Sequence, residues 1–331
     1  MIDTPLELLR ELRALGLVAA GADPVLASPA PGRPWYIGLM LGIAGWVAGV
    51  FLLIFAFMLF KLDSGVGAVI AGAVLIAAAW GLFAVDRDGA FVSQLALALS
   101  IAGQFALLFG LGDVFKGTHE IAGVALVALV LQAILIAVMP NALHRTMSAL
   151  FACTAWALLV RYGLWDQSPW GTRSAANAEL PFGLALAGWA IAWLPVGGVL
   201  YLIVRREAEW MARGLQALVR PAAAGVILGL AIGTLLSQPF ESFPWMSETA
   251  AGRGGLALWP LLSAFAALGA LAAAFALGRR GLTAVCVIAA LVHLSHFYYA
   301  MGAPLLAKSA TMIVLGALLL YGAHRLKGRA L

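Results

Sequence analysis

Long apolar runs separated by short polar breaks dominate the residue pattern of this chain. A helix needs about 20 apolar residues to cross the hydrocarbon core of a bilayer. Ten runs come close to or exceed that length, at residues 35–60, 65–84, 91–111, 120–139, 143–165, 181–204, 221–238, 255–277, 281–301 and 304–323. Charged residues, Pro and Gly fill the breaks, as in KLDS, PNALHR and GRRG. The pattern predicts an all-α fold, a polytopic transmembrane helical bundle with these ten spans.

The composition of the chain also indicates that most of it lies in lipid. The 331 residues are 63% hydrophobic and 11% charged, with a mean hydropathy of +1.00. Soluble domains are about 45–50% apolar and about 25% charged. So few polar side chains cannot cover a water-facing surface, which excludes a soluble globule and makes the lipid bilayer the partner of most of the chain. Cys153 and Cys286 lie inside apolar runs without a CxxC pair, so we expect packing residues.

Basic residues are unevenly shared between the two sets of breaks. With the N-terminus inside, the inner segments carry 14 Lys and Arg residues and the outer segments carry 6. Short cytoplasmic loops show such an excess. The distribution predicts cytoplasmic N- and C-termini, as an even number of spans requires. It also accounts for the net charge of +5 without nucleic acid as a partner.

Residues 1–34 form the first of two predicted parts, and residues 35–331 form a transmembrane domain. Thr4 and Glu7 fit a capping box, and leucines then recur at helical spacing. Acidic residues before any long apolar run argue against a signal peptide. We expect a cytoplasmic amphipathic helix and a linker, with the helix lying on the membrane surface or serving as a docking arm.

A second surface-lying helix is predicted over residues 205–220. Trp210 and Met211 are expected to face lipid, and the four arginines of this segment are expected to face anionic headgroups. On the other side, residues 166–180 and 239–254 form the two outer loops that are long enough to fold over a neighbouring surface.

Glycines recur at spacings of three or four residues, on one helix face, in two spans. They are Gly38, Gly42, Gly45 and Gly49 in the first span and Gly225, Gly229 and Gly233 in the seventh. Small residues let helix backbones approach closely in lipid. We expect these faces to pack within the bundle; the alternative is a homo-oligomer that associates through them.

The stretch HLSHFYYAMGAPLLAKSA, residues 293–310, is the most polar segment at membrane depth. With residue 281 at the inner boundary, His293 lies about 18 Å into a core roughly 30 Å thick. The last span descends from the outer side, so Lys308 lies about 6 Å below the outer surface. Both groups therefore fall in the outer leaflet, where ionisable side chains are costly and are functional candidates.

Two interpretations need only the outer end of this cluster. In the structural one, the tyrosines belong to an aromatic belt, Lys308 snorkels outward and the histidines join helices. In the second, a partner or ligand recognition site holds an acidic group of a lipid, peptide or protein. Its residues are His296, Tyr298, Tyr299, Lys308 and Ser309.

Two further interpretations need the histidines themselves. A proton or ion relay would use His293, His296 and Glu120 as its titrating groups. A metal site would require His119 and Glu120 to converge with both histidines, and no ligand spacing supports it, so we expect no metal. We also expect no cofactor, because His144 and His324 lie at the inner edge and leave no opposing mid-depth histidine for haem.

Gln104 and Gln132 lie near mid-depth of the third and fourth spans, with Ser100 nearby. We expect a hydrogen bond between the two amides that joins adjacent helices; the alternative is a polar substrate path. The chain has no GxSxG, HExxH, Walker or Rossmann pattern in a usable context, so we expect no catalytic residues and no enzyme activity.

The end of the chain resembles an uncharacterised bacterial membrane family, the domain of unknown function numbered four-four-zero-one. The shared mark is a tyrosine pair, a Leu-Leu and a Lys-Ser, here Tyr298, Tyr299, Leu305, Leu306, Lys308 and Ser309. The opening is also similar, with Trp35, Gly42 and Trp46 in a W-x6-G-x3-W pattern. The resemblance implies an inner-membrane protein without an assigned activity. It also implies a neighbouring gene for a small membrane-anchored protein with a G-D-Y-x-x-L-x-Y segment.

Together these features favour a non-enzymatic scaffold or partner-binding protein of the bacterial inner membrane, with its recognition site in the outer leaflet. The alternative is a small-solute or proton-coupled transporter that uses its membrane-embedded histidines. A transporter is expected to have a broken helix or a polar cavity that reaches the midplane, whereas a scaffold is expected to have a dry interior.

Overall fold

The computed structural model describes residues 13–14, 35–60, 65–85, 90–115, 120–164, 182–236 and 258–327. These ranges contain helices, turns and no strand. The long helices are α2 (Trp35–Phe60), α3 (Gly65–Val85), α4 (Ala90–Val114), α5 (Glu120–Val138), α6 (Ala142–Leu164), α8 (Phe182–Ala212), α9 (Gln216–Leu236), α10 (Leu258–Ala276), α11 (Arg280–Ala300) and α12 (Leu305–Lys327). The predicted helix over residues 1–34 and both long outer loops lie outside the described residues, apart from residues 13–14.

Each of the ten predicted spans coincides with one of these helices, so the all-α helical bundle is confirmed. Eight helices are long and apolar enough to cross a membrane by length and composition. In α2 and α12 the apolar stretches are shorter, at Leu39–Leu52 and Leu305–Ala317. The chain is therefore a multi-pass membrane protein.

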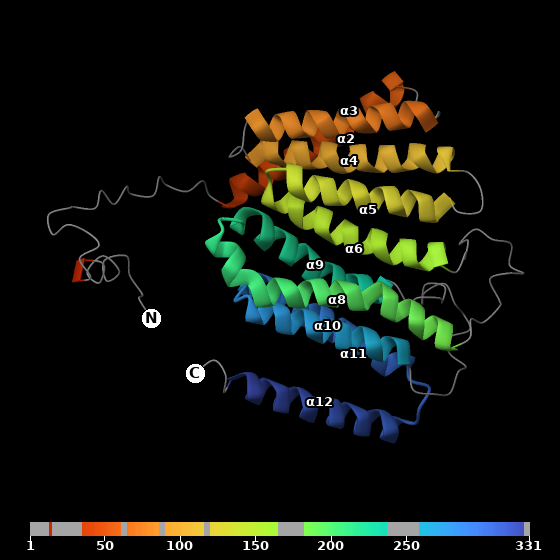
Figure 1. The fold of residues 1–331 in the computed structure, drawn as a ribbon, viewed down its shortest axis with the longest axis vertical. Coiled ribbons are helices and arrows are strands. Elements are labelled where there is room, and N and C mark those ends of the chain that lie inside the picture. The colour runs from red at the N-terminus through yellow and green to blue at the C-terminus, as the bar shows by residue number, and fades with distance from the viewer. Residues whose placement is uncertain are drawn as a thin grey trace, which may run out of the picture.

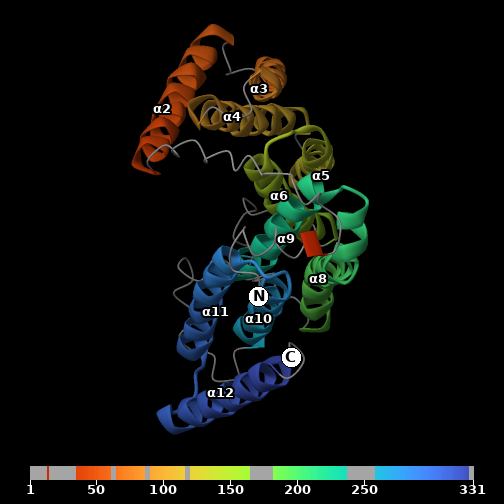
Figure 2. The same ribbon diagram turned by 90° about the vertical axis from the view of Figure 1, so that its left-hand side faces the viewer.

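The helices form an elongated stack in which successive helices run in opposite directions (Figure 1). Helices α2, α3 and α4 occupy one end of the stack and α12 occupies the other. Figure 2 shows α2 lengthwise where α3 is seen end-on, so α2 is inclined to α3. The start of α2 and the end of α12 lie on the same side of the stack (Figure 1), as an even number of crossings requires.

Glycines set the closest helix contacts. A Cβ atom on Gly72 of α3 would lie 2.6 Å from the carbonyl oxygen of Gly103 of α4, and one on Gly49 of α2 would lie 2.7 Å from Ala98 Cβ. In α9, a Cβ atom on Gly229 would lie 2.7 Å from Cys153 Cβ of α6. No larger residue fits such gaps without a shift of its neighbours. The described glycines of both predicted faces thus pack against helices of the same chain.

Helix α8 passes through a proline inside the membrane. Pro195 has no N–H, so the carbonyl of Ile191, four residues earlier, loses its helical donor. The indole Nε1–H of Trp156 in α6 donates to this carbonyl at 3.2 Å. A side chain of a neighbouring helix therefore satisfies the acceptor that the proline leaves open, as a bilayer interior requires.

The same solution occurs in α9. Pro221 leaves the carbonyl of Ala217 without its helical donor, and Arg145 Nη1 of α6 donates to it at 2.6 Å. The hydroxyl of Thr146 donates to the carbonyl of Pro221 itself at 3.2 Å. Helix α6 thus holds α8 and α9 through their backbones.

The predicted surface-lying helix over residues 205–220 is wrong. Helix α8 continues to Ala212, and α9 begins at Gln216 after a tight turn. Gly214 has a φ of +77°, and the N–H of Leu215 donates to the carbonyl of Trp210 at 3.1 Å, which together make a Schellman C-cap. The 31 residues of α8 span about 46 Å, more than the roughly 30 Å core, so its end projects beyond the bilayer.

Trp210 and Met211 also differ from their expected position. Instead of facing lipid, they pack with buried Ile203 of α8 and with Val219 and Ala223 of α9, inside the same hairpin. The hairpin therefore keeps its own small apolar core where it leaves the membrane.

Three apolar clusters make up most of the core. The largest joins α6, α8, α9, α10 and α11 and contains both Cys153 and Cys286, which are packing residues as expected. A second joins α3, α4 and α5. The third attaches α12 through Phe297 and Met301 of α11 and Leu315 of α12.

Candidate functional site

The predicted recognition residues come together at the junction of α11 and α12. Lys308 Nζ lies 5.2 Å from the centre of the Tyr298 ring, within range of a cation–π interaction. The Tyr298 and Tyr299 rings meet edge to face, with centroids 5.4 Å apart and an interplanar angle of 87°. We call Tyr298, Tyr299 and Lys308 the aromatic–lysine surface. Tyr299 is its open part, because 79% of that residue is exposed.

The turn between the two helices fixes this surface. Helix α11 ends where Met301 takes an extended conformation, and α12 begins after Pro304, whose carbonyl accepts from the Lys308 N–H at 3.1 Å. Lys308, Met312 and Leu315 recur at i, i+4 and i+7, so they share one face of α12. Met312 and Leu315 pack against Phe297 of α11, which is 0% exposed, and this contact turns Lys308 toward Tyr298.

The other predicted recognition residues stand at the edges of the surface. His296 is half-buried and Ser309 is exposed. Leu305 and Leu306, at the start of α12, are among the most exposed apolar side chains, and Leu306 is 85% exposed. The junction of α11 and α12, with these apolar, aromatic and cationic residues, therefore lies on the side of the stack opposite the turn between α8 and α9 (Figure 1).

His293 has a structural role. Its ring is buried, and Nε2–H donates to the carbonyl of Ala231 in α9 at 2.7 Å. This contact joins α11 to α9, as the structural interpretation of the histidines predicted. The relay prediction cannot be followed to Glu120 or the metal prediction to His119, because His119 and the Glu120 side chain lie outside the described residues. Among the described residues, no three His, Cys, Asp or Glu side chains gather as metal ligands.

A buried polar chain joins α4, α5 and α6. The predicted Gln104–Gln132 hydrogen bond is confirmed, with Gln132 Nε2 donating to Gln104 Oε1 at 2.7 Å. The chain continues from Gln104 Nε2 to Ser100 Oγ at 3.2 Å and from Ser100 Oγ to His144 Nε2 at 2.7 Å. Ser148 Oγ lies 3.3 Å from the other ring nitrogen, His144 Nδ1. All five residues are buried.

Gln132 donates to Gln104 and Gln104 donates to Ser100, so these two bonds point the same way. The Ser100 hydroxyl accepts from Gln104 and still has its own hydrogen to donate, for which His144 Nε2 is within reach. With that bond formed, the neutral imidazole carries its hydrogen on Nδ1, beside Ser148 Oγ. The bonds within this chain need no charged member, and no described charge lies within the chain to act as a counter-ion.

His144 lies in the first turn of α6, as its place at the start of a span predicted, but its contacts were not predicted. The turn between α5 and α6 is only three residues long, and Asn141 caps α6 by accepting from the His144 N–H at 3.0 Å. This places the imidazole against α4 at Ser100 and edge-on to Phe83 of α3, with ring centroids 6.0 Å apart. Counting along α6 alone missed this, because the position depends on how the turn sits against α4.

A serine–histidine contact of 2.7 Å also matches the geometry of a nucleophile and its base. Ser100, however, is 0% exposed, and neither Ser100 nor His144 lines the cavity beside this chain. Gln104 already occupies one acceptor position of the serine oxygen. The arrangement holds three helices together and does not present a nucleophile to a substrate.

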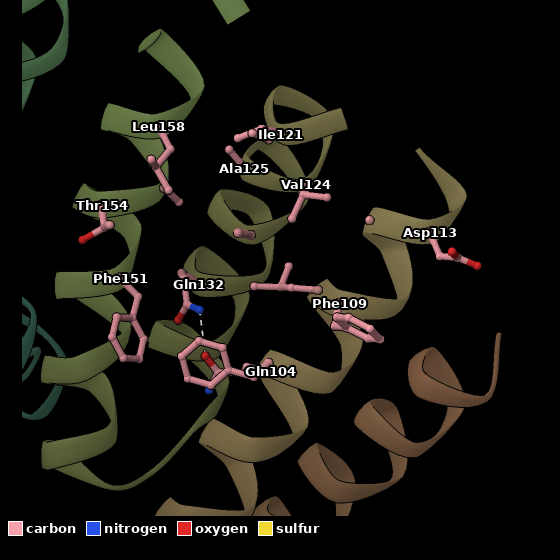
Figure 3. Close-up of a pocket in the computed structure, with 15 residues that line it drawn as sticks. Gln104, Phe109, Asp113, Ile121, Val124, Ala125, Gln132, Phe151, Thr154 and Leu158 are labelled. Carbon is pink, nitrogen blue, oxygen red and sulfur yellow. Dashed lines mark hydrogen bonds between the residues drawn. The ribbon is translucent and has the colours of Figure 1, made fainter. Parts of the chain in front are cut away.

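The cavity lies between the same three helices and has a volume of about 510 Å³. Figure 3 shows the amide pair of Gln104 and Gln132 at one end, with side chains of α4, α5 and α6 around it. Apolar residues make up most of its wall, among them Phe109, Val124 and Leu158. Sequence reasoning found the amides but not the space beside them.

No curated protein and no solved structure matches the chain. The family model described as "Domain of unknown function (DUF4401)" matches residues 34–252 and 250–328. The match includes the Trp35–Trp46 opening and the Tyr–Tyr, Leu–Leu and Lys–Ser mark at the end of the chain, so the resemblance found in the sequence is confirmed. The chain belongs to the DUF4401 family.

Proposed function

We propose that this protein is a non-enzymatic scaffold that binds a membrane partner through the aromatic–lysine surface. The observation that carries the proposal is the stacking of Lys308 on Tyr298, with Tyr299 open beside them. Exposed tyrosines are frequent anchors of protein interfaces. Leu305 and Leu306 extend the same edge with apolar area.

The surface favours a partner that carries both a carboxylate and an aromatic ring near the membrane boundary. Lys308 is the cation that a carboxylate would pair with, and Tyr299 offers an open ring for stacking. A small membrane-anchored protein with a G-D-Y-x-x-L-x-Y segment has both groups and is our first candidate. Its anchor would also reduce the entropic cost of binding, because both proteins share one membrane.

We place the surface at the outer face of a bacterial inner membrane, with both termini in the cytoplasm. Basic residues support this orientation. On the side of the stack where α2 begins and α12 ends (Figure 1), the described helix ends and turns carry Arg145, Arg205, Arg206, Arg213, Arg220, Arg279 and Arg280. The opposite side carries Arg161 and Lys308 among the described residues. Such an excess favours the first side as cytoplasmic.

The transporter alternative has less support. His293, its central residue, gives its Nε2–H to a backbone carbonyl, and α8 and α9 continue through their prolines without a break. The polar chain of α4, α5 and α6 is buried and internally satisfied along its length, apart from one amide oxygen. The cavity that ends at this chain has mostly apolar walls, which favours a scaffold over a path for a polar solute.

Co-purification from native membranes in mild detergent tests the proposal. The variants are Tyr299→Ala and Lys308→Met, and the matched control is Tyr36→Ala, which changes an exposed tyrosine of α2. We expect one membrane protein to follow the wild type and the control and to be lost from both variants. Retention of that protein by both variants, with normal elution on size exclusion, would contradict the proposal.

A further inference from the structure

The cavity between α4, α5 and α6 faces the bilayer. Phe105 and Phe109 of α4 line it and are also 64% and 69% exposed, so they stand at its rim. A volume of about 510 Å³ lies within the range of about 300–1,000 Å³ that is usual for small-molecule sites. Sites between the helices of a bundle are a common place for such ligands. The ligand of this cavity would therefore enter from the lipid.

One polar atom at the end of the cavity lacks a partner. Gln132 is 2% exposed, and its Oε1 accepts no hydrogen bond from the described residues, while its Nε2 donates to Gln104. A buried carbonyl oxygen without a donor is unfavourable, and more so in a membrane interior. The missing group is thus a donor, such as a hydroxyl.

The polar chain explains why this oxygen stays open. The Gln132 amide nitrogen donates to Gln104, and the Gln104 amide nitrogen donates to Ser100, so both bonds run away from the cavity. Reversal of the Gln132 amide would place its oxygen against Gln104 Oε1. The unfilled acceptor is therefore a consequence of the whole chain and not of one free rotation.

The cavity wall favours an uncharged ligand. Among the described residues that line it, Asp113 alone is ionisable, and in Figure 3 its carboxylate points away from the amide pair. No described charge near Gln132 would pair with an ionic headgroup, so a charged group would be poorly solvated there. The rest of the wall suits an alkyl chain or an aromatic ring.

We infer that this cavity binds a neutral apolar molecule of the bilayer that carries a hydroxyl group, a long-chain alcohol or a phenol, and that the hydroxyl donates to Gln132 Oε1. In the structure this oxygen is covered by its neighbours. Phe151 lines the same end of the cavity (Figure 3), so the inference requires a side chain at that end to move and admit the hydroxyl. The site is separate from the aromatic–lysine surface of α11 and α12 and does not depend on it.

Competitive photolabelling of the purified full chain in lipid nanodiscs tests the inference. The probe is a hexadecanol analogue with a diazirine on its alkyl chain, and labelled peptides are mapped by mass spectrometry. We expect labels on the cavity-lining segments of α4, α5 and α6. Unlabelled 1-hexadecanol should compete about fivefold more strongly than hexadecyl methyl ether, the ratio expected for one hydrogen bond of ordinary strength.

Two variants test the hydrogen bond to Gln132 and the volume of the cavity separately. Gln132→Met removes the acceptor, so the alcohol and the ether should compete equally. Ala128→Phe fills the cavity and should abolish labelling of these segments, whereas Ala133→Phe adds the same ring on the exposed face of α5 and should leave labelling intact. Because Ala128→Phe keeps the polar chain, it stays informative if Gln132→Met misfolds.

Either of two results would overturn the inference. One is equal competition by alcohol and ether in the wild type, which would mean that lipid tails fill the cavity without selection. The other is labelling that spreads over the exposed helix faces and ignores Ala128→Phe.

Discussion

The indole of Trp156 donates to the carbonyl of Ile191 at 3.2 Å, and Ile191 is the residue whose helical donor is missing because of Pro195. Arg145 does the same for Ala217, four residues before Pro221, at 2.6 Å. Two prolines in two helices are thus each matched by one donor from α6. Through this pairing α6 holds α8 and α9 by their backbones.

Trp156→Phe should destabilise the protein by about 1–3 kcal/mol, because it keeps the ring and leaves the Ile191 carbonyl unsatisfied. In a Pro195→Ala background the helix supplies its own donor, so the same change should cost less than about 1 kcal/mol. Unfolding in mixed detergent micelles measures both values. Equal costs in the two backgrounds would mean that the Trp156 indole does not compensate for the N–H that Pro195 lacks.

A second pair of changes, Arg145→Met and Pro221→Ala, tests the other proline in the same way. Arg145→Met should lower the melting temperature in the wild type, and Pro221→Ala should recover at least half of the loss, because the restored N–H takes over the Ala217 carbonyl. The comparison is made by thermal unfolding in one detergent. An undiminished loss in the double variant would mean that Arg145 acts through its charge alone.

These pairings show where sequence reasoning reaches its limit. The spans follow from apolar length, and the Gln104–Gln132 bond follows from two amides at equal depth in adjacent spans. Which carbonyl a tryptophan reaches depends on the rotation and tilt of two helices, and neither is encoded in a local pattern. The same holds for His144, whose contact with Ser100 depends on the height of the α5–α6 turn.

The error over residues 205–220 had a different origin. Basic and apolar residues alternate there as in a surface helix, but Gly214 follows a helical pattern directly, which is the signature of a C-cap. That glycine could have divided the segment into the ends of two helices. In the aromatic–lysine surface, by contrast, depth counting from the two span ends placed residues 293–310 and Lys308 in one leaflet, and the structure brings Tyr298 and Lys308 together.

Gly229→Ala should destabilise the bundle by about 1–3 kcal/mol, since the new Cβ would lie 2.7 Å from Cys153 Cβ. Gly198→Ala in α8 is the matched control. Nothing lies within 4 Å of its new Cβ, so the gain in helix propensity should leave stability equal or higher. Detergent unfolding of both variants tests this, and equal effects would contradict the close α6–α9 packing.

The amide pair should show coupling in a double-mutant cycle. Gln104→Leu and Gln132→Leu each leave the other amide buried without its partner, whereas the double change removes both amides. The double variant should therefore be more stable than the sum of the two single losses predicts. The coupling should be about 0.6–1.7 kcal/mol, as for hydrogen bonds between membrane helices. Strict additivity of the unfolding free energies would exclude the bond.

Partner binding at the junction of α11 and α12 is tested most directly by site-specific photocrosslinking in cells. A photoreactive residue replaces Tyr299 or Leu306 on the proposed interface, or Leu320 further along α12, while the small anchored protein with the G-D-Y-x-x-L-x-Y segment is co-expressed. We predict adducts with that protein from positions 299 and 306 and none from position 320. Adducts from position 320 alone, or none from 299 and 306 while the proteins are both present, would contradict the account.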